Sequence, residues 1–105
     1  MNFPSPGAAH ATSDRIALLV SLVASRNRIT SSRLLAFDRG RPIARLRAVT
    51  IFAARAVTSA SYPELGSVFS GRDHATILHA IKTVCENPDE LAAAAVVAFE
   101  MECAP

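Results

Sequence analysis

The residues with the most chemistry in this 105-residue sequence lie together at positions 72–76. An aspartate and a histidine, Asp73 and His74, are followed by the small side chains of Ala75 and Thr76. A carboxylate accepts a hydrogen bond from an amino group, an imidazole donates or accepts one, and a methyl group packs against another methyl. Such groups distinguish base edges in the major groove of duplex DNA. The segment therefore predicts contacts with a nucleic acid.

Two other uses of the same side chains are disfavoured by their spacing. Ser70, Asp73 and His74 are the residue types of a hydrolytic triad, but neighbouring helical residues point about 100° apart, so Asp73 is not placed to orient His74. His74 and His79 are five positions apart, whereas two zinc ligands on one helix face are four apart. We therefore expect that the protein is not an enzyme and that it binds neither a metal ion nor a cofactor.

The charges are distributed unevenly along the chain. Between Arg15 and Lys82 there are eleven basic and three acidic residues, and ten of those bases are arginine. The stretch 83–105 carries five acidic residues and no base. A basic central segment suits a polyanionic partner, and the planar guanidinium of arginine makes bidentate hydrogen bonds to phosphate or guanine. A solvated arginine-rich face explains the charges equally well, so charge alone does not decide.

The elements that must position these residues are helices. Capping side chains and apolar residues at helical spacing predict an all-α domain over residues 13–105, after a disordered leader at residues 1–12. The first helix is expected to begin at Ser13–Asp14 and end near Arg26, and a short helix to follow Thr30. Residues 37–42 are expected to form a loop. The later helices are predicted at about 43–58, 61–69, 73–86 and 89–102.

Residues 61–86 have the outline of a helix-turn-helix. Ser61 and Glu64 form a capping-box pattern, and Pro63 is tolerated in a first turn. Gly71 marks the turn before Asp73, which is a good N-cap. The second helix is expected to bury Ile77, Leu78, Ile81 and Val84.

Two other helices carry expectations about their faces. The long central helix is expected to turn its apolar side toward the core, with Arg45, Arg47 and Arg55 on its other faces. The last helix is apolar nearly all round. Core packing is the favoured explanation, and a homodimer through this helix is the alternative. Its two predicted apolar sides are Leu91, Ala94, Ala95, Ala98 and Phe99 on one, and Ala92, Val96 and Met101 on the other.

The segment from Gly71 to Ala80, GRDHATILHA, closely resembles the signature of the C-terminal DNA-binding domain of the bacterial replication initiator DnaA. Upstream, the ARLR at 44–47 resembles that family's Ala-Arg-Pro-Arg helix start, and the YPELG at 62–66 resembles its Leu-Pro-Glu-Ile-Gly helix. Leu34–Leu35 and the loop with Arg39 and Arg41 resemble its basic loop. The resemblance covers about residues 13–86, and it implies a Trp repressor-like helical fold.

The resemblance also implies roles for individual residues. Arg39 occupies the position that reads the minor groove, and Asp73, His74 and Ala75 occupy positions that contact bases in the major groove. Seven further residues occupy or flank the family's positions that contact the DNA backbone. Such contacts position the protein on the DNA but do not read its sequence. The seven residues are Arg41, Arg47, Arg55, Tyr62, Pro63, Thr76 and His79.

The sequence departs from the family pattern at two of these places. Ala75 stands where the family usually has Thr or Ser, so a hydroxyl is lost and discrimination at that base should weaken. Leu46 replaces a proline at the start of the long helix. The 105 residues contain no GxxxxGK[ST] motif, so we expect the DNA-binding domain as a stand-alone protein, without ATPase activity.

Regulation of replication initiation at initiator boxes is the expected function, with double-stranded DNA and replication-initiation regulatory proteins as partners. A transcriptional regulator with its own operator is the alternative within DNA binding. An interaction module of the replication machinery with weak DNA binding is the alternative from another class. Cys85 and Cys103 have no metal-ligand spacing and are expected to be reduced. We expect the protein in the cytoplasm, on the nucleoid.

Overall fold

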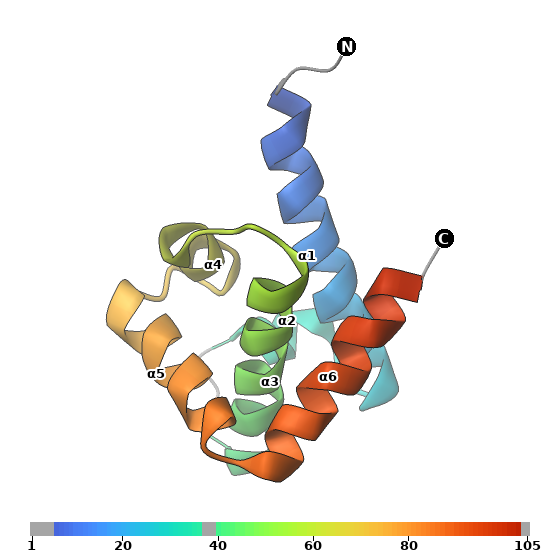
Figure 1. Ribbon diagram of the computed structural model, residues 1–105, viewed down its shortest axis with the longest axis vertical. Coiled ribbons are helices and arrows are strands. Elements are labelled where there is room, and N and C mark those ends of the chain that lie inside the picture. Colours follow the sequence, from blue (N-terminus) through green and yellow to red (C-terminus); the bar gives the residue numbers. More distant parts are fainter. Residues whose placement is uncertain (1–5, 37–39, 104–105) are drawn as a thin grey trace.

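A long central helix organises the molecule. The computed structural model describes residues 6–36 and 40–103. Within them it contains six helices and no strand: α1 (Pro6–Arg26), α2 (Ser31–Leu35), α3 (Arg41–Val57), α4 (Tyr62–Val68), α5 (His74–Cys85) and α6 (Pro88–Cys103). The all-α prediction is confirmed. Helix α3 packs against all five other helices, and it lies between α5 and α6 in Figure 1.

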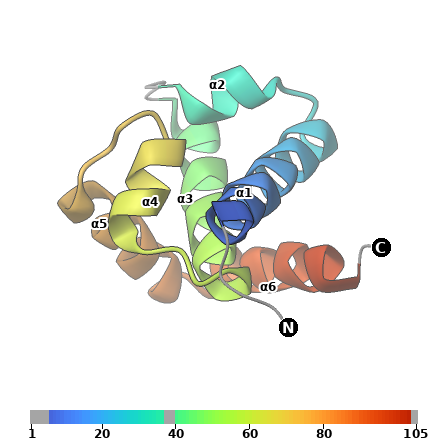
Figure 2. The ribbon, with the colours of Figure 1, turned by 90° about the horizontal axis from the view of Figure 1, so that it is seen from above.

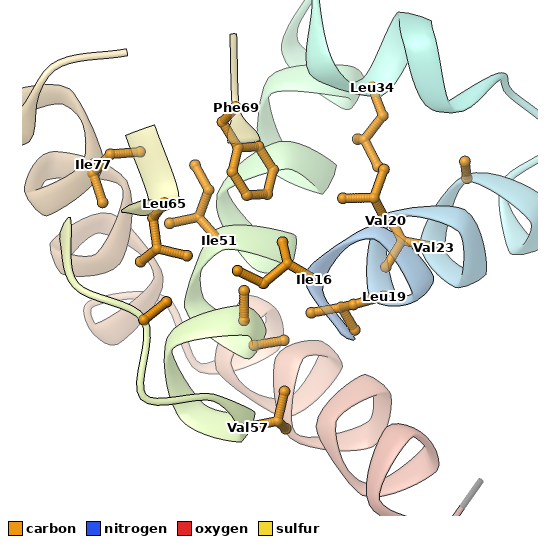
Figure 3. Close-up of a cluster of buried hydrophobic side chains, with 14 residues drawn as sticks. Ile16, Leu19, Val20, Val23, Leu34, Ile51, Val57, Leu65, Phe69 and Ile77 are labelled. Atoms are coloured by element: carbon orange, nitrogen blue, oxygen red, sulfur yellow. The ribbon is translucent and has the colours of Figure 1, made fainter. Parts of the chain in front are cut away.

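The core is formed where α1, α3 and the helix-turn-helix meet. Viewed from above, α4 and α5 lie on one side of α3 and α1 lies on the other (Figure 2). Figure 3 shows the side chains that fill the space between them. They include Ile16 and Leu19 of α1, Ile51 of α3, and Leu65 and Phe69 from α4 and its C-cap, each no more than 1% exposed. Burial of these apolar side chains holds α4 and α5 on the scaffold.

The first helix begins earlier than predicted. Helix α1 starts at Pro6, so the expected start at Ser13–Asp14 is wrong, and residues 6–12, expected as a leader, are helical. Proline is tolerated in a first helical turn, and Ala8, Ala9 and Ala11 are strong helix formers. The helix extends away from the body of the molecule at its N-terminal end (Figure 1).

Two predicted apolar faces are also corrected. Leu78 is 42% exposed, so α5 buries Ile77 and Val84 but not Leu78. On α6 the residues that pack inward are Ala94, Val97, Ala98 and Met101, whereas Leu91, Val96 and Phe99 are exposed. A helix that is apolar nearly all round has no face determined by its own sequence, so its neighbours decide which side is buried.

The three glutamates of α6 have arginine partners on other helices. Arg15 Nη2 lies 3.3 Å from Glu102 Oε1, and Arg45 Nε lies 3.4 Å from Glu90 Oε2. Arg26 forms an ion pair with Glu100. In each pair the arginine side chain is exposed to solvent, so the pairs stabilise the fold little. They show that α6 neutralises arginines of α1 and α3. None of the helices described is both long enough and apolar enough to cross a membrane.

Candidate nucleic-acid interface

The tip of α5 is built by its own cap and by the turn before it. The turn takes two left-handed residues, Ser70 at φ 64° and Gly71 at φ 74°. Asp73 then caps the helix, and its carboxylate accepts a hydrogen bond of 2.9 Å from the Thr76 backbone N–H. Hydrogen bonds from the Thr76 backbone, and next from its side chain, lower the pKa of the Asp73 carboxyl. The predicted cap is confirmed.

The residues predicted to touch bases lie exposed at this tip. Asp73, His74 and Ala75 are all exposed, and so is Thr76 behind them. None of them is covered by α6, which packs against the other end of α5 through the turn at Asn87. The arrangement leaves a carboxylate, an imidazole and a methyl group accessible to a ligand.

His74 has an aromatic neighbour from α4. Its ring lies 4.9 Å from the ring of Tyr62, with an angle of 89° between the planes. The Arg55 guanidinium carbon lies 4.7 Å from the Tyr62 ring centroid, and Arg55 also donates to the Ala60 carbonyl. Edge-to-face rings and a cation over a ring are both favourable contacts. The structure therefore brings together three predicted site residues from three helices.

Thr76 and His79 lie on a groove between α3 and α5. The groove has a volume of about 440 Å³ and is also lined by Arg45, Arg47 and Arg72. Pro63 is exposed beside Tyr62 in the first turn of α4. Thr76 and His79 therefore share the groove between α3 and α5, whereas Tyr62 and Pro63 lie in the first turn of α4.

Arg47 does not lie where it was predicted. It is only 8% exposed, and its Nε donates a 2.9 Å hydrogen bond to the Leu34 carbonyl. The expected outer face is wrong because α2 packs against this side of α3. Arg47 therefore joins two helices of the scaffold.

Arg72 belongs to the segment 72–76 that the sequence pointed to as a nucleic-acid contact, but the structure gives its side chain a structural role. Its guanidinium donates to the carbonyls of Phe69, Leu35 and Ala36. Burial, and then the nearby positive charge of Arg47, lower the pKa of Arg72. Local spacing gives no signal for this role, since Leu35 and Arg72 are far apart in the sequence.

The predicted basic loop falls largely outside the described residues. Arg39 lies there, so its predicted minor-groove contact stays a prediction, whereas Arg41 is the first residue of α3. Ala36 and Gly40 flank the gap. Among the residues described, no group of three or more His, Cys, Asp or Glu could hold a metal ion.

The helix-turn-helix geometry agrees with comparisons to known proteins. Residues 16–84 match the family model described as "Bacterial dnaA protein helix-turn-helix". The chain is 47% identical over 62 residues to the chromosomal replication initiator protein DnaA of Dechloromonas aromatica (strain RCB). The aligned residues cover 59% of this chain and 13% of that protein. The DnaA of Sphingopyxis alaskensis is 42% identical over 62 residues, with 59% of this chain and 14% of that protein covered.

A solved structure supports the fold. A crystal structure of a DNA replication initiation factor has a TM-score of 0.78 to this chain, covering 86% of this chain and 29% of the other at 24% identity. Fold and exposed tip together define a helix-turn-helix protein of the DNA-binding class. The chain belongs to the bacterial dnaA protein helix-turn-helix family, whose model spans more than half of its length.

Proposed function

We propose that this chain binds double-stranded DNA sequence-specifically through the tip of α5, and that it regulates the initiation of chromosome replication. The observation that carries the proposal is the exposed Asp73–His74–Ala75 tip, supported from behind by Tyr62 and Arg55. Its relatives are named as chromosomal replication initiators. This chain spans only 13–14% of their length, and for it we propose DNA binding without ATPase activity.

The proposed contacts divide into two groups. Asp73, His74 and Ala75 read base edges in the major groove, and Arg39 reads the minor groove, where negative potential attracts arginine. Contacts to phosphates fix the position of the protein. For these we propose Arg41, Arg55, Tyr62, Pro63, Thr76 and His79. Arg47 is left out of this group because it is only 8% exposed and its Nε is bonded to the Leu34 carbonyl, whereas Arg55 is exposed.

The test is a binding titration with duplexes that contain or lack the nine-base-pair initiator box, at two salt concentrations. Binding should prefer the box and weaken with salt, because neutralised phosphates release counterions. His74→Ala or Arg39→Ala should reduce the preference by about 5- to 150-fold, since one good base contact discriminates by ~1–3 kcal/mol. Arg15→Ala is the matched control, because Arg15 is paired with Glu102. Equal preference in all of these proteins would refute the assignments.

Two alternative roles predict other outcomes of genome-wide occupancy. A replication regulator acting on the nucleoid, in the cytoplasm, should occupy boxes near the origin. A transcriptional regulator should occupy promoters that lack the box. An interaction module that recruits regulatory proteins should keep its partners after His74→Ala. The exposure of Asp73 and His74 favours the DNA-binding roles.

A homodimer through α6 stays a prediction. Phe99 is 69% exposed and Val96 is 54% exposed, and exposed apolar groups on one helix favour association. Sedimentation equilibrium of the whole chain should then give a dimer mass that Phe99→Ser reduces. A monomer at high concentration would remove this proposal and leave DNA binding unaffected.

A further inference from the structure

The C-terminal end of α2 is held by side chains from other elements. The last carbonyls of a helix have no partner within it. In α2 the carbonyls of Ser32 and Arg33 accept from the Ala36 backbone N–H. The Leu34 carbonyl accepts from Arg47 on α3. The next two carbonyls, at residues 35 and 36, are bonded by the turn of the helix-turn-helix.

Two residues of that turn make these bonds. Ser70 Oγ donates to the Leu35 carbonyl at 2.7 Å. Arg72 Nη1 donates to the same carbonyl at 2.9 Å and to the Phe69 carbonyl at 2.6 Å, and Arg72 Nη2 donates to the Ala36 carbonyl at 2.8 Å. One planar guanidinium thus joins α2 to the end of α4.

The backbone of Arg72 is held as well. Its N–H donates to the Gly66 carbonyl at 3.0 Å. The next residue along the chain is Asp73, the cap of α5, followed by His74. Hydrogen bonds from a charged donor are stronger than those from a neutral donor. The guanidinium bonds and the backbone bond of Arg72 together restrain the chain directly before the exposed tip.

We propose that Arg72 is a positioning residue for base reading: it touches no DNA and holds the tip of α5 in the orientation that DNA requires. This inference rests on the proposed function and goes beyond it, because a residue at the start of a recognition helix would otherwise be assigned a direct contact. Pre-organised groups bind better because less ordering is left to binding. Ser70 contributes in the same way through the Leu35 carbonyl.

The experiment measures binding and local order separately. The variants of the full chain are Arg72→Ala, Arg72→Lys and Ser70→Ala, with Arg15→Ala as the control. Titrations with box and scrambled duplexes over a range of salt concentrations give the preference and the salt slope. Amide hydrogen exchange without DNA reports on Thr76 and Ile77, whose N–H groups bond to Asp73.

A positioning role predicts a distinct combination of results. Arg72→Ala should lower the box preference about 10-fold, as expected for the loss of bonds from a charged donor, while the salt slope stays unchanged. Arg72→Lys should recover part of the preference, because an ammonium lacks the planar fork. Ser70→Ala, the milder change, should lower it less. Exchange at Thr76 and Ile77 should accelerate in the same order.

Other outcomes overturn the inference. A salt slope reduced by about one, with all duplexes weakened equally, would identify Arg72 as a phosphate contact. Unchanged exchange and unchanged preference in the folded Ser70→Ala and Arg72→Lys proteins would show that the bonds do not orient the tip. If the unaltered chain binds no duplex, the proposed function fails, whereas the exchange data still show whether Arg72 orders the tip.

Discussion

The ring of Tyr62 meets the imidazole of His74 edge to face, with 4.9 Å between the ring centroids. Arg55 lies over the same tyrosine ring at 4.7 Å. This contact links the start of α4 to the start of α5, so it limits the orientations that the exposed imidazole can take. The same helix-turn-helix outline would leave His74 without an aromatic neighbour if a small residue stood at position 62.

Removing the tyrosine ring should therefore affect base reading. Tyr62→Ala is expected to lower the preference for the box about 2- to 12-fold, because an aromatic pair contributes ~0.5–1.5 kcal/mol beyond its buried area. Fluorescence anisotropy with box and scrambled duplexes measures it. Tyr62→Phe keeps the ring and should keep the preference for the box, while loss of the hydroxyl proposed to contact a phosphate should weaken binding to both duplexes about equally. A Tyr62→Ala protein with full preference would show that the ring does not orient His74.

The close approach of α4 to the turn depends on Gly66. A Cβ at Gly66 would lie 2.1 Å from the Arg72 carbonyl oxygen, so the backbone would have to move. Gly66→Ala should lower the free energy of unfolding by about 3 kcal/mol or more, as severe overpacking does. Urea denaturation followed by circular dichroism measures this loss.

Gly71 provides the matched comparison. A Cβ there meets nothing within 4 Å, and only its φ of +74° disfavours a side chain. Gly71→Ala should therefore cost about 1 kcal/mol. Equal losses for the two variants would contradict the role of close packing at Gly66.

Restoring the family's hydroxyl at position 75 should sharpen sequence preference. Ala75 is exposed in the first turn of α5, so a threonine fits without disturbing the core. Ala75→Thr is expected to raise discrimination at one base pair by up to about 10-fold, within the ~1–3 kcal/mol of a good base contact. Competition with single-base variants of the box measures this. Ala75→Val is the control, since it adds bulk without the hydroxyl.

The cap at Asp73 should make stability depend on pH in the acidic range. Its pKa is lowered in the folded state, chiefly by the hydrogen bond from the Thr76 backbone. The contribution of the charged cap is therefore fully present above the unfolded pKa of about 3.9. It is lost as the pH falls through the lower folded value.

The comparison is with Asp73→Asn, which keeps a capping oxygen but does not titrate there. The difference in melting temperature between the two proteins should shrink as the pH falls below about 4. Glu64, whose pKa is also lowered, is present in both and cancels. A difference that stays constant with pH would show that the Asp73 charge does not stabilise the cap.

What the sequence predicted correctly was local. Thr30, Ser61 and Asp73 were predicted to cap helices, and each bonds a backbone N–H three residues ahead. A cap of this kind involves one turn of chain, so the amino acids at that turn are enough to specify it. The six helices and the turn at Gly71 follow from the same short-range chemistry.

Some positions were misjudged because local chemistry does not decide them. Leu78 and Phe99 have apolar side chains at helical spacing, but each remains exposed. Arg47 has a charged side chain, but it is buried. In each case the result depends on whether another helix covers the residue, and the sequence around the residue does not specify that.

The sequence by itself determined that this protein is all-helical and that an Asp–His pair begins the second helix of a helix-turn-helix, because caps, turns and helical periodicity act over a few residues. Only the tertiary structure decided that the Tyr62 ring packs against the His74 ring and that Arg72 donates hydrogen bonds to the carbonyls at the end of α2. Both contacts depend on how closely packed helices meet. The positions of the interacting groups are then set by the whole core rather than by any one segment.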